Sequence, residues 1–261
     1  MGNPGRSQGA RGLQATGGRV DTDGKTGTHA LPPALRSLLA DGAASIGIEL
    51  TPAQIDAFEA YTSAIRLWGR RLGLTRILSP EDIVRLHFLD SLSCLTVIPD
   101  TPGLGVVDVG SGAGFPGVPI AIARPDIRLT LIEASQKRVA FLELLTMELG
   151  LDADVLHGRA EEICRQAGHF EAYDVVTSRA AAPMKRLAGL CLPFLRVGGT
   201  AVLPKGARGE GELREAVGAI SAFGGEVAGI EHVRIRGLEG TRRVIVVLRK
   251  VRSAPLSYPH R

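Results

Sequence analysis

The stretch VVDVGSGAGFPG, at residues 106–117, runs from a short apolar segment into a turn made almost entirely of small residues. Its glycines allow the backbone to approach a ligand closely and to adopt positive φ angles, and Pro116 is placed to open a helix. At the carboxyl end of a strand in an α/β sheet, such a turn commonly binds a nucleotide-type ligand. The stretch therefore predicts a strand, a ligand-binding loop and a helix in succession.

Two classes of ligand suit this loop. Residues 112–117 match the GxGxxG pattern of dinucleotide-binding folds, whereas Asp108 and the three alternating glycines after it match the acidic-x-Gly-x-Gly-x-Gly pattern of S-adenosylmethionine-dependent methyltransferases. Asp108 discriminates between the two, because a carboxylate near the end of a buried strand is costly unless it is paired. An anionic pyrophosphate offers it no partner, but the ammonium group and the sulfonium of S-adenosyl-L-methionine do. We therefore favour the methyl donor over a dinucleotide and over a purely structural turn.

Short apolar runs alternate with helical stretches after a break at residues 100–103. This rhythm predicts an α/β fold with a mostly parallel, Rossmann-like sheet that carries helices on both faces. The expected strands are 104–109, 127–133, 153–157, 173–178, 200–204 and 243–250, and the expected helices are 116–123, 136–149, 160–166, 183–195 and 209–222. The glycines within residues 236–240 suit a tight turn before the last strand, so we expect an antiparallel hairpin at or near one edge.

The segment before this break has a helical pattern and predicts a small helical subdomain at residues 31–99. Thr51 and Gln54 suit a capping box, after which apolar residues recur every three or four positions. Residues 1–30 have almost no large apolar side chains and are expected to form a disordered tail. The methyltransferase domain is placed at residues 100–252 and a C-terminal tail at residues 253–261.

The composition is that of a globular chain, which suits one α/β domain with a smaller appendage. The 261 residues are 44% hydrophobic and 22% charged. No run approaches the ~18 apolar residues of a transmembrane helix, and the first residues lack the apolar core of a signal peptide, so we expect a cytoplasmic protein. Cys94, Cys164 and Cys191 are odd in number and widely spaced, which favours buried, reduced thiols over disulfides or a metal site.

The charge of the chain is mildly basic and unevenly distributed. The formal net charge is +4 and the sequence pI is about 9.2, which permits a nucleic-acid partner without requiring one. Residues 231–261 contain eight basic and two acidic residues, a net charge of +6. That stretch is either a solvated face or a surface that contacts phosphate. Aromatic residues make up only 4% of the chain, which argues against RNA binding by rows of stacked rings.

Charged residues follow the predicted strands at the edge of the sheet where the glycine loop lies. Glu133 ends the second strand and can accept both ribose hydroxyls of an adenosine, unless it is only a solvated glutamate. Ala160 and Glu161 follow the third strand, where a loop can bind adenine, although an acidic first helical turn is also common for electrostatic reasons. Arg179 and Lys205 follow the next two strands. A cation there needs an acceptor phosphate, a cofactor carboxylate or an internal acid as its partner, and a structural role stays open for both.

The chain resembles a known family, the bacterial small-subunit ribosomal RNA guanine-N7 methyltransferases of type G, also called glucose-inhibited division protein B. The resemblance extends from about residue 51 to residue 251. It rests on LT at 74–75, HFLDS at 87–91, DVGSGAGFPG at 108–117, KR at 137–138, SRA at 178–180 and LPKG at 203–206. His87, taken alone, is more often a structural than a catalytic histidine. The family usually has asparagines near Trp68, where this chain has glycines and arginines.

The resemblance implies a class I S-adenosylmethionine-dependent methyltransferase fold with a seven-stranded sheet, and methylation of N7 of a guanine in 16S ribosomal RNA. It places the cofactor contacts at Gly110, Phe115, Ala160, Glu161 and Arg179 and the ribose-binding acid at Glu133, beside the Asp108 and Gly112 of the glycine motif. The cofactor is S-adenosyl-L-methionine. The implied partner is small-subunit ribosomal RNA or the 30S particle, and we expect neither a membrane nor DNA as a partner, and no metal.

The chemistry of guanine N7 explains why the sequence need not contain a general base. This nitrogen has a lone pair and no proton in the neutral base, so positioning and desolvation can carry the methyl transfer. Arg179 and Lys205 are the candidates for holding the RNA phosphate or a flipped-out guanine near the donor. Two other function classes stay open from the residues alone, namely a methyltransferase of this fold acting on a small molecule or protein, and a non-catalytic RNA-binding module.

Overall fold

The computed structural model describes residues 31–179, 182–240 and 242–255. The tail predicted at residues 1–30, and residues 256–261 of the predicted C-terminal tail, lie outside the described residues. None of the described helices is long and apolar enough to cross a membrane.

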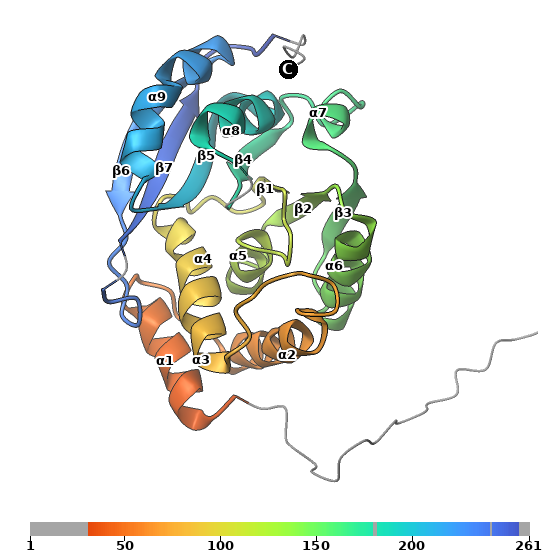
Figure 1. Ribbon diagram of the computed structural model, residues 1–261, viewed down its shortest axis with the longest axis vertical. Helices are drawn as coiled ribbons and strands as arrows, with labels where there is room; N and C mark the ends of the chain where they lie inside the picture. The colour runs from red at the N-terminus through yellow and green to blue at the C-terminus, as the bar shows by residue number, and fades with distance from the viewer. Residues whose placement is uncertain (1–30, 180–181, 241, 256–261) are drawn as a thin grey trace, which may run out of the picture.

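A seven-stranded sheet with the order β3-β2-β1-β4-β5-β7-β6 runs through the molecule (Figure 1). The strands are β1 (Gly105–Val109), β2 (Arg128–Glu133), β3 (Ala153–His157), β4 (Tyr173–Thr177), β5 (Leu195–Gly206), β6 (Gly225–His232) and β7 (Arg243–Lys250). β7 is antiparallel to both of its neighbours, and the other pairings are parallel. The predicted mostly parallel sheet with an antiparallel final pair is confirmed.

The strands on the β6 side of the sheet differ from the prediction in extent. β5 begins at Leu195, five residues before the predicted strand, and β6 is absent from the strand segments that the sequence predicts. Most side chains of β6 are exposed or half-buried, because it is an edge strand, so it lacks the apolar run that marks the buried strands. Backbone hydrogen bonds to β7 hold it in the sheet.

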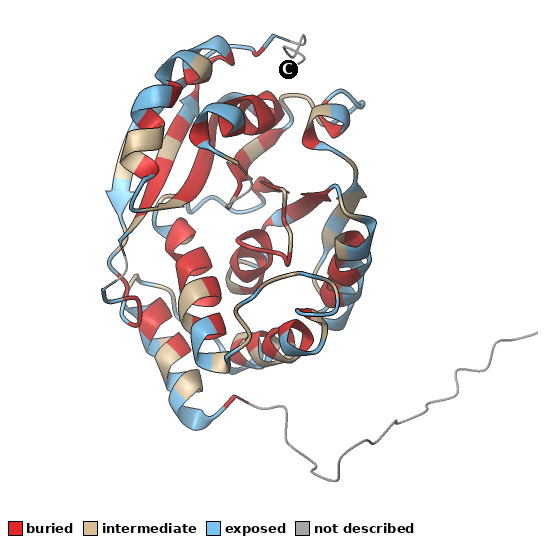
Figure 2. Ribbon diagram, viewed as in Figure 1, coloured by how far each residue is buried: buried red, intermediate tan, exposed pale blue. Residues whose placement is uncertain are grey.

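Helices cover both faces of the sheet. α5 (Gly117–Ala123) and α6 (Gln136–Glu148) pack on one face, and α7 (Ala160–Ile163), α8 (Met184–Cys191) and α9 (Gly209–Ala222) pack on the other. Each face has its own apolar cluster, because successive strand residues point to opposite sides. Buried residues therefore follow the central strands and the inner faces of the helices (Figure 2). α7 and α8 end several residues before the predicted helices do.

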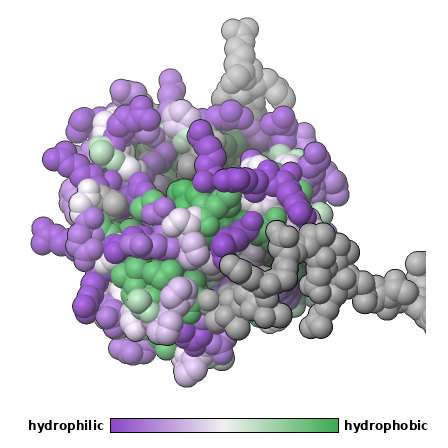
Figure 3. Space-filling view, turned by 60° about the horizontal axis from the view of Figure 1, so that its bottom comes forward, coloured by the Kyte–Doolittle hydropathy of each residue, from purple (hydrophilic) through white to green (hydrophobic). Residues whose placement is uncertain are grey.

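The N-terminal segment extends the helix layer that contains α5 and α6. Its helices are α1 (Pro33–Ala44), α2 (Pro52–Trp68), α3 (Pro80–Ile83) and α4 (Asp90–Leu92), with a π-helical turn at Val84–Leu89 between the last two. Phe58, Tyr61 and Phe88 are completely buried in the apolar cluster that also contains α5. The outward face of this layer is mostly hydrophilic, with smaller hydrophobic patches between the polar side chains (Figure 3). The predicted helical segment is thus helical, and it shares its core with the sheet.

The three cysteines are buried, and no disulfide forms among these residues, all of which lie in the described part of the chain. Burial raises the pKa of the Cys191 thiol to about 12 and also raises the pKa of the Cys94 thiol. Both therefore stay protonated at neutral pH. The prediction that the three thiols are buried is confirmed, and their reduced state stays a prediction.

One cation of the basic stretch at residues 231–261 is internal. Lys250 is completely buried, and its ammonium group donates to the carbonyl oxygens of Leu192 and Phe223, 2.7 and 3.3 Å away. A carboxylate oxygen of Glu171 lies 3.2 Å from the same nitrogen. For Lys250 the interpretation as part of a solvated or phosphate-contacting surface is wrong, because its charge is satisfied inside the protein.

The predicted capping box at the start of α2 is present and reaches a second helix. Thr51 Oγ1 accepts from the backbone N–H of Gln54, and the side-chain oxygen of Gln54 accepts from the backbone N–H of Thr51. The amide Nε2 of Gln54 also donates to the carbonyl oxygens of Ile122 and Ala123, 2.8 and 3.2 Å away. Gln54 thus ties the start of α2 to the end of α5, the helix that follows the glycine loop.

We expect Gln54→Ala to destabilise the fold more than Thr51→Ala does. Loss of the threonine cap costs about 1 kcal/mol, whereas loss of the glutamine also leaves two carbonyls at a helix end without their donor. Urea unfolding followed by circular dichroism measures both changes. Equal losses in the two variants would show that the contact with α5 contributes nothing.

Candidate functional site

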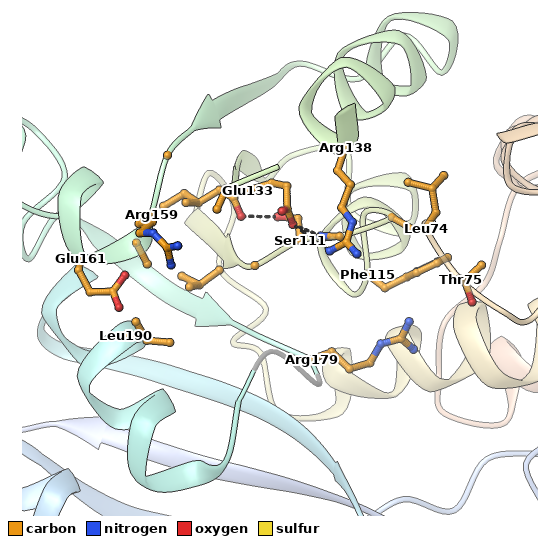
Figure 4. Close-up of a pocket in the computed structure, with 18 of the residues that line it drawn as sticks. Leu74, Thr75, Ser111, Phe115, Glu133, Arg138, Arg159, Glu161, Arg179 and Leu190 are labelled. Atoms are coloured by element: carbon orange, nitrogen blue, oxygen red, sulfur yellow. Dashed lines mark hydrogen bonds and ion pairs between the residues drawn. The ribbon is translucent and has the colours of Figure 1, made fainter. Parts of the chain in front are cut away.

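A cavity of about 490 Å³, called the first cavity below, opens at the edge of the sheet where β1, β2, β3 and β4 end (Figure 4). Its walls come from the loop after β1, the ends of β2 and β3, and the start of α7. Leu74, Thr75 and His87 from the N-terminal segment close one side. The volume falls in the range of roughly 300–1,000 Å³ that is usual for ligand pockets.

The glycine loop at residues 110–114 forms one wall and is held by α2. Its three alternating glycines have φ angles of 71°, 60° and 99°, a region that other residues rarely adopt. The Tyr61 hydroxyl donates to the Ala113 carbonyl over 2.6 Å, and the Tyr61 ring stacks on Phe115 with centroids 5.2 Å apart. A Cβ atom at Gly114 would lie 2.6 Å from the Tyr61 hydroxyl oxygen. The close approach of Tyr61 therefore requires a glycine at this position.

Glu133 lies at the end of β2, beside the glycine loop. Its side chain is buried, and its Oε2 accepts from the backbone N–H of Gly112 over 2.9 Å while Oε1 accepts from Ser135 N–H over 2.9 Å. Arg138 Nη1 lies 3.9 Å from Oε2. Each carboxylate oxygen still has a lone pair to offer, so Glu133 is preorganised to accept two ligand hydroxyls.

Most of the residues predicted to contact a cofactor meet in this cavity. Seven of the eight line it: Gly110, Gly112, Phe115, Glu133, Ala160, Glu161 and Arg179. Arg159 and Glu161 lie at one end, with Leu190 of α8 nearby, and Phe115 and Thr75 lie at the other (Figure 4). The tertiary structure thus assembles one elongated pocket from segments far apart in the sequence.

Asp108 is the exception among the eight. It is completely buried, and its carboxylate accepts from Gly117 N–H over 3.2 Å and from the Thr177 hydroxyl over 3.0 Å. Burial raises the pKa of Asp108 to about 6, although these hydrogen bonds oppose the rise. The partners that the sequence argument sought in a ligand are thus found in the protein, where Asp108 braces the start of α5. A direct contact between Asp108 and a cofactor stays a prediction.

Arg179, just beyond β4, has an internal acid as its partner. One guanidinium nitrogen donates to Asp90 Oδ2 over 2.9 Å and to the Leu86 carbonyl over 3.1 Å. The other lies 2.9 Å from His87 Nδ1. The guanidinium carbon also lies 4.7 Å from the centre of the Phe115 ring. Arg179 is therefore held rigidly, with its charge already paired, at the border of the cavity.

His87 is neutral, and its tautomer follows from its neighbours. Because an arginine can only donate, His87 Nδ1 must accept from Arg179, and Nε2 then donates to Thr75 Oγ1 over 3.0 Å. Burial and the charge of Arg179 lower the pKa of His87 to about 3. The ring also stacks on Phe115 with centroids 4.3 Å apart. His87 lies in the π-helical turn, a local distortion that often occurs at functional sites.

A second cavity of about 570 Å³ adjoins the first, and His87 and Arg179 line both. Lys205 lines the second cavity, where its ammonium group donates to the Ala182 carbonyl and to Glu212 Oε2, each over 3.0 Å. Burial opposes ionisation of Glu212, but the hydrogen bonds from Lys205 and Met184 N–H and the charges of Lys205 and Arg208 together outweigh it and lower the pKa of Glu212. Lys205 and Arg179 are therefore both ion-paired, and both face the same space.

Five residues that shape this site are not among the predicted site residues: Tyr61, Thr75, Asp90, Glu212 and Arg243. Thr75 and Asp90 occur in the motif segments that carry the family resemblance, and nothing else in the sequence indicates that they belong to the site. Tyr61 looks like one more member of an apolar helix stripe. Glu212 and Arg243 look like ordinary polar residues of a helix and a strand. Arg243 pairs with Asp90, which is distant in the sequence, and Glu212 pairs with Lys205 of the preceding strand.

The chain is similar in sequence to proteins of one known family. The model of a family described as rRNA small subunit methyltransferase G matches residues 54–243. Ribosomal RNA small subunit methyltransferase G of Roseiflexus castenholzii is 43% identical over 218 residues, which are 83% of this chain and 92% of that protein. The protein of the same name from Symbiobacterium thermophilum is 40% identical over 234 residues, 87% of this chain and 95% of its own length.

Solved structures of distant sequence share the fold. A chain from the Haloferax volcanii complex that contains the Trm112 methyltransferase activator has a TM-score of 0.53 at 16% identity, covering 74% of this chain and 98% of that one. The branched-chain polyamine synthase from Thermus thermophilus has a TM-score of 0.51 at 13% identity, covering 64% of this chain and 57% of that one. At this identity the likeness concerns the fold alone.

We expect His87 to make the protein less stable in acid. Its pKa is lowered on folding, so the stability present above pH 6.5 is lost as the pH falls toward 3. At pH 5 the protonation of this residue in the unfolded chain lowers the free energy of unfolding by about 2 kcal/mol. Denaturant unfolding measures the free energy of unfolding at pH 7.5 and at pH 5. Between these two pH values, it should fall by about 2 kcal/mol less in His87→Gln than in the wild type. An identical loss in both proteins would contradict the neutral, buried histidine.

Proposed function

This chain belongs to the rRNA small subunit methyltransferase G family, and we propose that its first cavity holds S-adenosyl-L-methionine while the acceptor base approaches beside Arg179. The fold is that of class I S-adenosylmethionine-dependent methyltransferases, and the enzyme methylates N7 of a guanine in 16S ribosomal RNA. The observation that carries the assignment of the cavity is the carboxylate of Glu133, which faces the same space as the glycine loop.

The residues of the first cavity fit an adenosine that carries a sulfonium. Glu133 offers lone pairs to the two ribose hydroxyls, and Ala160 and Glu161 lie where the adenine would extend. The glycine loop exposes bare backbone to the methionine portion, because side chains are absent from alternate positions. When bound, the cofactor supplies an electrophilic methyl group on a positively charged sulfur.

The protein's own task in methyl transfer to N7 is to align two reactants. N7 attacks with its lone pair and releases no proton, so no side chain has to act as a base, and alignment alone can contribute roughly 7–11 kcal/mol. His87 has both ring nitrogens engaged, by Arg179 and Thr75, and therefore orients Arg179 rather than moving a proton. Arg179 is already immobilised, so it can contact an incoming nucleotide with little further loss of side-chain entropy.

We propose 16S ribosomal RNA, free or within the 30S particle, as the macromolecular partner, and the cytoplasm as the location. Exposed arginines lie in and near the loop between α2 and α3, close to the cavity wall formed by Leu74 and Thr75: Arg66, Arg70, Arg71 and Arg76. Such a surface can contact backbone phosphates, and binding through it should weaken as salt rises. Lys205 would help to hold the RNA from the second cavity.

The function is tested by incubating the protein with methyl-labelled S-adenosylmethionine and small ribosomal particles. We expect label in 16S ribosomal RNA at one guanine, located by chemical cleavage at N7-methylguanosine. Ribonuclease treatment of the particles before the reaction should abolish the labelling. Label retained in protein or in small molecules would favour the other methyltransferase classes and contradict this assignment.

Glu133→Gln should weaken cofactor binding. The amide has one accepting oxygen where the carboxylate has two, and a hydrogen bond to a charged group contributes roughly 1.5–3 kcal/mol, so we expect a rise in Kd of about 10- to 100-fold. Calorimetric titration with S-adenosylmethionine measures the change. Glu143→Gln, on the exposed face of α6, is the matched control and should bind normally. An unchanged Kd in Glu133→Gln would remove the ribose contact from the proposal.

Arg179→Ala and Lys205→Ala should both slow methylation of ribosomal RNA. Each removes a cation from the space into which the acceptor enters, and each leaves a carboxylate, Asp90 or Glu212, with one partner fewer. Initial rates at saturating cofactor separate this effect from weaker cofactor binding. Wild-type rates in both variants would contradict the positioning role.

A further inference from the structure

The second cavity is a separate pocket that adjoins the first cavity. It shares only the His87 and Arg179 wall with the first cavity, and its other walls come from β5, α9, β7 and the N-terminal helices. A ligand in it would therefore lie next to the ligand of the first cavity without overlapping it.

The lining of this cavity combines apolar walls with a few charged groups. Ile77, Leu86, Pro183 and Pro204 provide apolar surface. The charged side chains are Arg179, Lys205, Arg208 and Arg243 on the basic side and Asp90 and Glu212 on the acidic side, an excess of two positive charges. Arg243 Nε is buried and forms an ion pair with Asp90 Oδ1, 3.1 Å away. This combination suits a flat, polar ligand with an anionic group, such as a nucleotide.

Glu212 is an acidic residue of this cavity that hydrogen bonds from the protein hold in one orientation. Oε2 is engaged twice, by the Lys205 ammonium group over 3.0 Å and by Met184 N–H over 3.1 Å. Oε1 receives no hydrogen bond from the described residues for which contacts are given. The side chain is 31% exposed and lines the second cavity but not the first. Glu212 therefore presents a fixed, ionised acceptor to the part of the cavity that the cofactor does not reach.

We propose that the second cavity binds the flipped-out acceptor guanine and that Glu212 accepts hydrogen bonds from its N1–H and 2-amino groups. With N7 directed at the cofactor, the Watson–Crick edge of the base points away from the shared wall, and a flipped base is commonly read at this edge. Guanine alone among the four RNA bases presents two adjacent donors there. Adenine would place the N1 lone pair against the carboxylate, so Glu212 selects guanine by repulsion as well as attraction.

The role of Lys205 follows from this arrangement. Its ammonium group is engaged by Ala182 and Glu212, so it fixes the carboxylate and keeps it ionised. Lys205 is thus a positioning residue for Glu212. This refinement rests on the proposed function, because it presumes that guanine N7 is the acceptor.

The test pairs a change in the protein with a change in the base. Wild type, Glu212→Gln and the control Glu215→Gln, an exposed glutamate of the same helix, are assayed on small subunits reconstituted with 16S ribosomal RNA. The RNA carries either guanosine or inosine at the methylated position, and inosine differs only in lacking the 2-amino group. Cofactor affinity and the thermal midpoint are measured for each protein.

We expect inosine to lower the wild-type kcat/KM by roughly 10- to 100-fold, the effect of losing part of a bidentate base contact. Glu212→Gln should lose a similar factor on guanosine, lose less on inosine because the 2-amino contact is already missing there, and bind the cofactor normally. Glu215→Gln should behave as the wild type. If Glu212 only supported the local structure, the two losses would multiply, and that result would overturn the proposal.

The wild-type comparison decides the matter even if Glu212→Gln fails to fold. Equal rates on guanosine and inosine would overturn the guanine contact while leaving the proposed function intact. No methylation of guanosine by the wild type would instead overturn the proposed function and this refinement with it.

Discussion

The carboxylate of Asp90 holds together the parts of the molecule that form the site. It is buried, its Oδ2 accepts from Arg179 over 2.9 Å, and its Oδ1 lies 3.1 Å from Arg243 Nε. These residues come from the N-terminal helices, the end of β4 and the start of β7. A buried charge is tolerable only when it is paired, so the three elements must meet for any of them to be stable in this position.

The two cavities share a wall because of this cluster. Arg179 is fixed by Asp90, Leu86 and His87, and its guanidinium lies over Phe115 of the glycine loop. The same loop is held from α2 by the hydroxyl of Tyr61. The N-terminal helices therefore do more than add stability to the sheet, because they set the shape of the first and of the second cavity together.

For the proposed methyl transfer, the contribution of a site of this kind is its rigidity. The histidine at its centre is neutral, the arginine is paired, and the carboxylates of Glu133 and Glu212 are each held by donors from the protein before a ligand arrives. For an attack that transfers no proton, such preorganisation is the contribution a protein can make. Nucleotide selectivity can then come from one fixed carboxylate rather than from a large interface.

Local patterns in the chain were enough to predict the alternating strands and helices, the glycine loop, the capping box of α2 and the placement of Glu133, because each depends on residues close in sequence. Pairing across the fold was not accessible in this way. Asp108 finds its partners in Gly117 and Thr177, Arg179 in Asp90, Lys205 in Glu212 and Lys250 in Glu171. A charge on a buried strand indicates only that some partner must exist. Which partner it is depends on the packing of distant elements, and the edge strand β6 likewise owes its place to hydrogen bonds with β7 rather than to an apolar run of its own.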